Sequence, residues 1–226
     1  MKKYGSRTSS MRILLNSDSD RGIIAAKEVK QGEEMLFVPD EAIISLYRAR
    51  SVKWSKELIV KGFDKLGMYK ESAYMVVYIM HLKLLPPDQN ELHHWLETLP
   101  TSTQEFPIFF AKEDMNILDG SPIIEKINIQ KRFLRSDYNQ IIELVPEIGE
   151  KYTFDEYCHY WLIVNSRWFG LEIAGRYEIC MVPFADMVNH RHENTIKWKY
   201  DDMNEGFVMI AEEDHKIGDS VFSNYG

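Results

Sequence analysis

The sequence predicts an α+β protein in which two groups of short β-strands are separated by a long helical insertion. Residues 22–39 and 179–222 carry short apolar runs bounded by Gly, Pro, Asn or Asp, as strands and turns do. Residues 39–169 instead carry apolar residues at helical spacing. At 226 residues, the chain is long enough for one sizeable core with an insertion.

The N-terminal part predicts β-structure. Residues 12–15 are expected to form a short strand, and residues 16–22, NSDSDRG, a loop in which small residues let the backbone approach a ligand closely. Residues 23–29 and 35–38 are apolar runs on either side of the turn sequence KQGE, and Pro39 ends the second run. We predict that these two runs pair as a β-hairpin.

The central part predicts helices, and several residue types mark their ends. Pro86 and Pro87 end the second helix, since proline lacks the amide that a helix needs. Thr153 and Glu156 have the spacing of a capping box, which predicts the start of the last helix, and Gly170 is its expected end. The predicted helices cover residues 40–50, 71–85, 93–100, 121–144 and 153–170.

The last predicted helix carries an aromatic stripe and one arginine. Tyr157, Trp161, Val164 and Trp168 recur at helical spacing, a pattern typical of a core face. Arg167 lies near the end of this helix. It needs an acceptor if it is buried, whereas at the surface it would interact favourably with the helix dipole. Both interpretations of Arg167 stay open on local grounds.

The C-terminal part predicts strands at residues 179–182, 196–200, 206–211 and 220–222. Directly behind the first of these come Asp186, Asn189, His190 and His192, set against apolar residues. Burying such polar groups without partners costs about 1–3 kcal/mol each. They therefore either satisfy one another in a strand-to-loop turn or hold a ligand.

Composition excludes several classes of protein. Hydrophobic residues make up 45% of the chain, which is typical of a globular protein, and the net charge of −8 disfavours a nucleic-acid partner. No apolar run approaches the ~18 residues of a membrane span, so no membrane partner is expected. Cys158 and Cys180 stand alone, which argues against a disulfide framework or a structural zinc site and favours a reducing compartment.

The sequence gives little support for a metal site, a cysteine nucleophile or a phosphate-binding loop. His190 and His192 would share one face of a strand, but no third ligand at suitable spacing is evident, so no metal site is predicted. Neither cysteine has a neighbouring sequence that would activate its thiol. The phosphate-binding patterns GxxxxGK[ST] and GxGxxG do not occur.

Four segments, taken in order, carry a resemblance to a known family. They are RGIIAAKEVKQGEEMLFVP at 21–39, NSRWFG at 165–170, VPFADMVNH at 182–190 and GDSVFSNYG at 218–226. Together they resemble the SET-domain methyltransferases, in the branch that contains the Rubisco large-subunit lysine methyltransferase and the actin-histidine methyltransferase. The long helical insertion is also typical of this branch. The resemblance covers the chain from about residue 16 onward, and it implies the SET β-fold with a C-terminal pseudoknot.

The resemblance implies S-adenosylmethionine as the cofactor, with a role for each matched residue. Backbone groups of Ser19, Asp20, Arg21 and Gly22 would contact the cofactor, and Asp186 would brace the loop. Arg167 would pair with the carboxylate of the methionine part, Asn189 would bond the amino-acid part, and the backbone of His190 would hold the adenine. Tyr225 would be the catalytic tyrosine, close to the Asn-His loop. Trp168, Phe169 and Phe222 would line the substrate channel or belong to the core.

The implied reaction transfers a methyl group to a lysine side chain of a non-histone protein. Such an in-line displacement depends mostly on alignment, and a tyrosine hydroxyl with backbone carbonyls can orient the reactants. The histidine-modifying members tend to carry an amide at the position of Phe169, so this aromatic residue favours lysine. A histidine methyltransferase and a catalytically silent interaction module are the alternatives.

The resemblance also implies a division of the chain. Residues 1–15 would be a tail and first strand, 16–40 the N-terminal hairpin, 41–170 the helical insertion and 171–226 the C-terminal core. Family members normally continue into an all-helical substrate-binding domain, which we expect to be absent from this chain. We further expect a monomer that acts on a protein substrate in the cytoplasm or nucleus.

Overall fold

The computed structural model describes residues 4–15, 21–65, 67 and 70–225. It divides the chain into two compact units, each of which is described by itself. We call Met1–Ser45 with Trp168–Gly226 the β unit, and Leu46–Arg167 the helical unit. The predicted site residues Ser19 and Asp20 lie outside the described residues.

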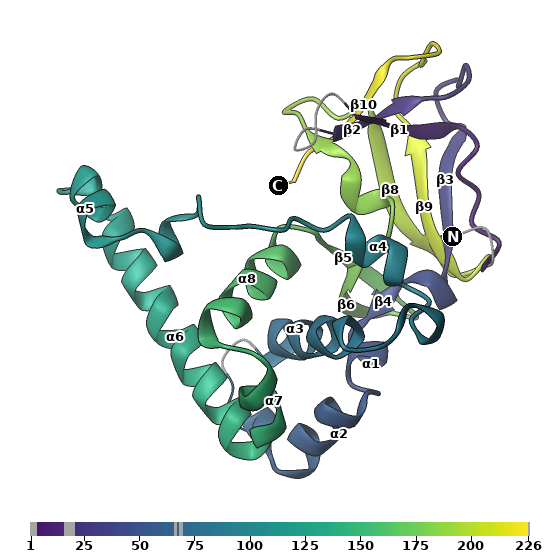
Figure 1. Ribbon diagram of the computed structural model, residues 1–226. Helices are drawn as coiled ribbons and strands as arrows, with labels where there is room; N and C mark the ends of the chain where they lie inside the picture. Colours follow the sequence, from purple (N-terminus) through teal and green to yellow (C-terminus); the bar gives the residue numbers. More distant parts are fainter. Residues whose placement is uncertain (1–3, 16–20, 66, 68–69, 226) are drawn as a thin grey trace. The chain divides into compact units, whose positions relative to one another are not determined.

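The β unit contains short strands arranged in small sheets (Figure 1). The described strands are β1 (Met11–Leu15), β2 (Arg21–Ala25), β3 (Glu34–Pro39), β4 (Ile44–Ser45), β5 (Trp168–Ile173), β6 (Arg176–Met181), β7 (Asn189–His190), β8 (Ile196–Asp201), β9 (Gly206–Ala211) and β10 (Ser220–Ser223). The strand orders are β1-β2-β10-β7, β3-β9-β8 and β4-β6-β5. The unit also contains the 3-10 turns η2 (Asp40–Ala42) and η7 (Ala185–Met187).

The N-terminal hairpin differs from the predicted one. β2 pairs antiparallel with β1, whereas β3 pairs antiparallel with β9 in another sheet, so the predicted pairing of residues 23–29 with 35–38 is wrong. The intervening segment is bonded elsewhere: Val29 exchanges two backbone hydrogen bonds with His215, and Gly32 donates to the Ala211 carbonyl at 2.9 Å. These bonds direct the chain from β2 toward β9, because backbone groups pair with the strand that lies nearest in space.

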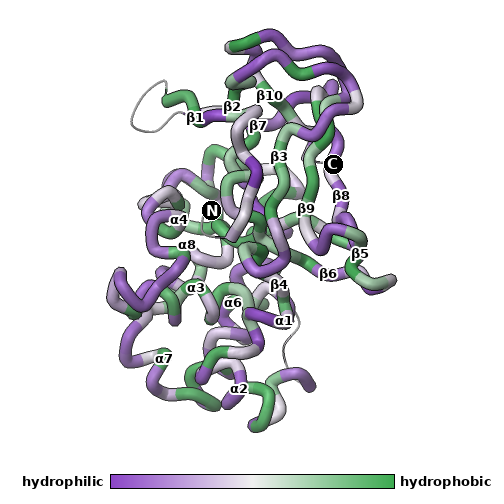
Figure 2. The backbone as a smooth tube through the Cα atoms, turned by 90° about the vertical axis from the view of Figure 1, so that its right-hand side faces the viewer, coloured by the Kyte–Doolittle hydropathy of each residue, from purple (hydrophilic) through white to green (hydrophobic). Residues whose placement is uncertain are grey.

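The core of the β unit is centred on β3 and β9. Met35, Leu36 and Val38 are at most 1% exposed, and Phe207 and Met209 on β9 are fully buried. Figure 2 shows both strands as predominantly hydrophobic stretches, coloured green. At Gly206 an added Cβ would lie 2.6 Å from the Phe37 ring, so only glycine lets the two strands pack at this distance.

The helical unit consists of helices and 3-10 turns. The α-helices are α1 (Leu46–Ala49), α2 (Lys53–Val60), α3 (Lys70–Lys83), α4 (His93–Glu97), α5 (Lys112–Met115), α6 (Ile123–Leu144), α7 (Pro146–Lys151) and α8 (Phe154–Asn165). The 3-10 turns are η3 (Phe63–Lys65), η4 (Pro87–Gln89), η5 (Pro107–Phe109) and η6 (Asn116–Leu118). None of the described helices is long and apolar enough to cross a membrane.

Helix α3 is the centre of the helical unit's core. Its residues from Ala73 to Met80 are all buried, and α1, α2, α4 and α8 contact it. Two buried tyrosines connect neighbouring elements through hydrogen bonds. The Tyr152 hydroxyl donates to the Met80 carbonyl at 2.6 Å, and the Tyr138 hydroxyl donates to the Tyr152 carbonyl at 2.6 Å. These bonds satisfy carbonyls that would otherwise be costly to bury.

Two predicted helices give way to strands. Residues 40–50 form a 3-10 turn, strand β4 and the short α1, because Ile44 and Ser45 pair with β6. The last helix ends at Asn165 instead of Gly170. The Ser166 hydroxyl donates to the Ile163 carbonyl, and from Trp168 onward the backbone pairs with β6 as strand β5. Trp168 is therefore outside the helical stripe and is 40% exposed.

The start of α8 has the predicted capping box. The Thr153 hydroxyl accepts from the Glu156 amide, and the Glu156 carboxylate accepts from the Thr153 amide at 2.7 Å.

We expect Thr153→Ala to lower the free energy of unfolding by about 1 kcal/mol, because a first-turn amide loses its acceptor. Urea unfolding measures this change. Thr153→Ser keeps the hydroxyl and is the control; an equal loss in both variants would contradict the capping interpretation.

Candidate functional site

The end of the chain is inserted between two other strands of the β unit. β10 pairs antiparallel with β2, with Val221 opposite Ile23, and parallel with β7, with Phe222 opposite Asn189 and Ser223 opposite His190. Residues 220–223 thus lie between the Asn-His segment and β2. This arrangement assembles the candidate site.

Thr195 and the residues around it hold the C-terminal segment. The Thr195 hydroxyl accepts from the Phe222 amide at 2.9 Å, and the Thr195 amide donates to the Phe222 carbonyl at 3.1 Å. The Arg191 amide donates to the Ser223 carbonyl at 3.1 Å, and the Asn224 side-chain amide donates to the His192 carbonyl at 3.1 Å. Both sides of the segment are therefore bonded, which fixes its register against residues 189–195.

Tyr225 lies against His190. The Tyr225 amide donates to Nδ1 of His190 at 3.2 Å, and the two ring centroids are 5.1 Å apart. The Tyr225 hydroxyl donates to the carbonyl of Val188 at 2.6 Å, while the residue as a whole is 64% exposed. The ring and hydroxyl of Tyr225 are held at defined positions at the surface of the β unit.

Asn189 connects the Asn-His segment to the start of β2. Its side-chain amide donates to the Arg21 carbonyl at 2.9 Å. An added Cβ at Gly22 would lie 3.2 Å from this amide nitrogen, which is tighter than an ordinary contact. Glycine at position 22 therefore lets β2 and the Asn189 side chain approach closely.

The turn before Asn189 is strained. Phe184 has φ 77 and ψ −45, an unusual backbone conformation for a non-glycine residue that costs on the order of 1–3 kcal/mol. The Asp186 amide donates to the Val182 carbonyl, and the Val188 amide donates to the Ala185 carbonyl, so the turn is tightly closed. Asp186 is 8% exposed, and its turn contacts β2. The strain and the burial fix the direction in which Asn189 and His190 leave the turn.

The aromatic candidates have different surroundings. Phe169 packs edge-on against Trp198 and Phe207, with ring centroids 5.2 and 5.1 Å away. Trp168, the first residue of β5, is largely exposed. The Arg191 guanidinium carbon lies 4.8 Å from the centre of the half-buried Phe222 ring.

The structure brings most of the predicted site residues into one unit. In the β unit lie Arg21, Gly22, Trp168, Phe169, Asp186, Asn189, His190, Phe222 and Tyr225. Arg167 is the last residue of the helical unit, and its amide donates to the Val164 carbonyl at 3.2 Å. Sequence reasoning missed Thr195, because a single threonine before a strand carries no signal for a partner 27 residues away.

The two cysteines are unsuited to nucleophilic catalysis. Both are buried, and burial raises the pKa of the Cys158 thiol and of the Cys180 thiol to about 12. The reactive thiolate is therefore scarce at neutral pH. The groups of the candidate site that can take part in a reaction are therefore the hydroxyl, amide and backbone groups around Asn189 and Tyr225.

Comparisons with known proteins identify the family. The family model described as SET domain matches residues 20–226, and the chain belongs to this family. The ribosomal lysine N-methyltransferase set10 of Schizosaccharomyces pombe is 26% identical over 83% of this chain and 35% of its own length. The actin-histidine N-methyltransferase of Xenopus tropicalis is 21% identical over 100% of this chain and 39% of its own length.

The fold matches a solved SET domain. The crystal structure of the SET domain of LSMT bound to lysine and AdoHcy has a TM-score of 0.80 and 15% identity, and the match covers 100% of this chain and 52% of that one. The predicted α+β SET fold is thereby confirmed. The chain spans between a third and a half of the length of set10 and of the actin-histidine enzyme.

The close approach of Gly22 and Asn189 is testable by a double-mutant cycle. We expect Gly22→Ala to lower the free energy of unfolding by about 1 kcal/mol, because the new methyl group displaces the Asn189 amide. In an Asn189→Ala background the same change should cost close to nothing, giving a coupling of at least ~0.5 kcal/mol. Urea unfolding of the four proteins measures it. Additive effects of the two substitutions would contradict the contact.

Proposed function

We propose that the chain carries the methyl-transfer site of an S-adenosylmethionine-dependent protein methyltransferase whose acceptor is a lysine of a non-histone protein. One observation carries the proposal: in a chain of the SET-domain family, β10 pairs with the Asn-His segment and brings Tyr225 against His190 and the Val188 carbonyl. The solved SET domain of LSMT, which has the same fold, was crystallised with lysine and AdoHcy, and this supports the proposal.

The residues at the start of β2 fit the cofactor. Gly22 presents backbone without a side chain to the Asn189 amide, in a space that a Cβ would fill. Backbone groups of Ser19, Asp20, Arg21 and Gly22 would contact the cofactor there. Asn189 would bond its amino-acid part, and backbone groups of His190 would hold its adenine. Asp186 would brace this loop from its buried turn.

Arg167 would bind the carboxylate of the cofactor. A guanidinium presents several donors in one plane and pairs with a carboxylate through charge-assisted hydrogen bonds. Arg167 directly precedes β5, so its backbone is fixed on one side by α8 and on the other by the pairing of Trp168 with Met181. The backbone of Arg167 therefore has a fixed position from which its side chain extends.

Tyr225 would orient the reacting groups. When bound, S-adenosylmethionine supplies a methyl group on a positively charged sulfur. The Tyr225 hydroxyl donates a hydrogen bond to the Val188 carbonyl, which fixes the position of its oxygen. From there the oxygen would orient an acceptor amine or a polarised methyl group. The bond from the Tyr225 amide to His190 fixes the backbone behind this hydroxyl. Alignment, more than acid–base chemistry, would supply the rate enhancement.

The aromatic residues would form the path of the acceptor. Trp168 is exposed at the start of β5, and Phe169 beside it packs on Trp198 and Phe207. Phe222 lies on the strand that leads to Tyr225. The aromatic residue at position 169, where histidine-modifying members tend to carry an amide, favours lysine as the acceptor.

Histidine is the second candidate acceptor. The match to the actin-histidine N-methyltransferase covers 100% of this chain at 21% identity. The match to set10, a lysine enzyme, covers 83% of this chain at 26% identity. Both relatives are named for modifying amino-acid side chains, so a protein substrate is common to the two candidates. Lysine is preferred because of Phe169 and because of the higher identity to set10.

The proposal extends to the organisation of the chain. The helical unit, Leu46–Arg167, would correspond to the insertion predicted at residues 41–170. The segments 16–40 and 171–226 would form the methyl-transfer core. We propose further that the protein acts as a monomer in the cytoplasm or nucleus.

Cofactor binding is the first test. We expect S-adenosylmethionine to bind the intact chain in a calorimetric titration. Asn189→Ala and Arg167→Ala should each weaken binding by ~1.5 kcal/mol or more, about tenfold, since each removes a hydrogen bond to a polar or charged group. Arg176→Ala, at an exposed arginine of β6, is the matched control and should bind normally. No binding by the intact chain would refute the proposed function.

The second test is mass spectrometry of the proteins of a cell extract treated with the chain and S-adenosylmethionine. We expect methyl groups on lysine side chains of cellular protein after incubation with the chain and cofactor, and none with Tyr225→Phe. The variant loses the hydroxyl that lies 2.6 Å from the Val188 carbonyl. Methylation of histidine would refute lysine as the acceptor. Cofactor binding without transfer to any protein would indicate a silent interaction module.

A further inference from the structure

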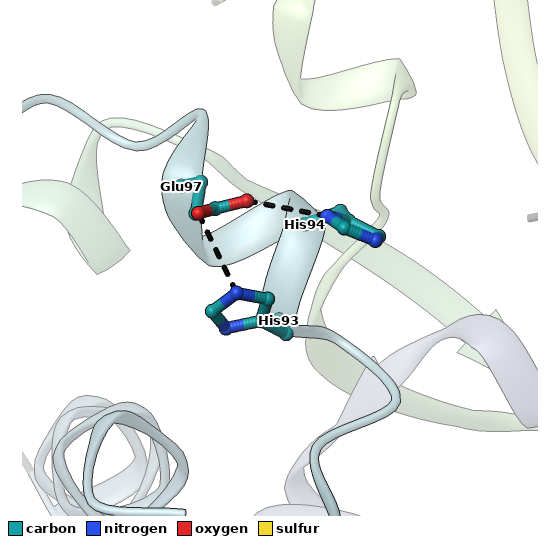
Figure 3. Close-up of side chains that lie close together, drawn as sticks. All are labelled: His93, His94 and Glu97. Carbon is teal, nitrogen blue, oxygen red and sulfur yellow. Dashed lines mark hydrogen bonds and ion pairs between the residues drawn. The ribbon is translucent and has the colours of Figure 1, made fainter. Parts of the chain in front are cut away.

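Three potential metal ligands converge on the surface of the helical unit, in a region that the proposed methyl-transfer site does not use. They are His93, His94 and Glu97 of α4, and one ligand atom from each lies within 4.8 Å of the other two. Nε2 of His93 is 3.4 Å from one oxygen of Glu97, and Nδ1 of His94 is 3.2 Å from the other. Figure 3 shows both imidazoles turned toward the same carboxylate.

The backbone beneath this cluster is held rigidly. The apolar side of α4 is buried through Leu92, Trp95 and Leu96, each at most 7% exposed. Before the helix, the buried Asn90 accepts from the Leu92 amide and donates to the Leu82 carbonyl. After it, the Thr98 hydroxyl donates to the Trp95 carbonyl at 2.7 Å. The three ligands therefore project from a fixed scaffold, which favours ligand binding by lowering its entropic cost.

Ion pairing explains this arrangement poorly. Both imidazoles precede the carboxylate along α4, and in the i,i+4 pair His93 comes before Glu97. Helix polarity favours the opposite order, with acidic groups first and cationic groups last. One carboxylate also serves two imidazoles, and His94 is 96% exposed, so a protonated pair would be screened by water. Neutral imidazole, by contrast, is the form that binds metal ions.

The distances match a tetrahedral metal site. With metal–ligand bonds of about 2.0–2.1 Å, neighbouring ligands of a tetrahedral zinc ion lie about 3.3–3.4 Å apart. The two imidazole–carboxylate distances, 3.4 and 3.2 Å, are close to this length, although they reach different oxygens of Glu97. The ligand atoms of the three residues all lie within 4.8 Å of one another, and the His94 side chain is 96% exposed, so neighbouring groups do not block rotation of its ring. Imidazole and carboxylate ligands suit zinc better than magnesium or calcium.

We propose that His93, His94 and Glu97 form a zinc-binding site with two imidazole ligands and one carboxylate ligand. Three protein ligands leave a fourth coordination position for water or an incoming group, as in sites built from two histidines and a glutamate. The site lies in the helical unit and needs no residue of the candidate methyl-transfer site. It therefore stands independently of the proposed function.

Zinc titration of the intact chain tests the site. We expect one equivalent of Zn²⁺ to bind, and Co²⁺ to give the visible absorption of a tetrahedral ion. His94→Ala and Glu97→Gln should each weaken Zn²⁺ binding at least ~10-fold, because each removes a ligand. Both side chains are exposed, so the fold should survive, and circular dichroism checks this. Mg²⁺ should not compete.

His192→Ala is the matched control, since it removes an exposed histidine from the β unit. It should leave Zn²⁺ affinity unchanged. Unchanged affinity in both His94→Ala and Glu97→Gln, loss of binding in His192→Ala, or a Co²⁺ spectrum without tetrahedral bands would each overturn the proposal.

Discussion

The β unit depends on the backbone hydrogen bonds that hold β10 between β2 and β7. This strand has only four residues, so each bond is a large share of what fixes it. Thr195 satisfies both the amide and the carbonyl of Phe222, which are partly shielded from water. Leaving such groups unpaired would cost about 1–3 kcal/mol each. The position of the chain end is thus determined by hydrogen bonding more than by apolar burial.

The register of this pairing determines where Tyr225, the proposed catalytic residue, lies. Phe222 lies opposite Asn189, and Ser223 lies opposite His190, which leaves Tyr225 two residues beyond the last pair. A slip by one residue would turn successive side chains to the other face of the strand. The Tyr225 amide would then lose His190, and its hydroxyl would lose the Val188 carbonyl. The pairing of β10 and the position of Tyr225 in the proposed site therefore depend on the same few bonds.

Apolar burial, more than hydrogen bonding between segments, organises the helical unit. Its central helix α3 is buried nearly all round, and side chains of neighbouring segments satisfy two of its carbonyls: Tyr152 donates to Met80 and Asn90 donates to Leu82. Apolar burial of this extent holds the short helices around α3 in place, although a helix as short as α4 would be unstable alone. That packing gives His93, His94 and Glu97 fixed positions. The zinc site we propose is a consequence of this core.

The sequence by itself determined the local elements and the family. Proline, glycine and the Thr153–Glu156 capping box act within a few residues of the backbone, so helix starts, turns and the strands at 196–200 and 206–211 could be predicted from them. The tertiary structure alone decided which strands pair, where the last helix gives way to β5, and that Thr195 holds Phe222. It also decided that Tyr225 meets His190 and that two imidazoles share Glu97. The reason is physical: hydrophobic periodicity is a local property, whereas a backbone group pairs with whichever distant segment the folded chain brings nearest.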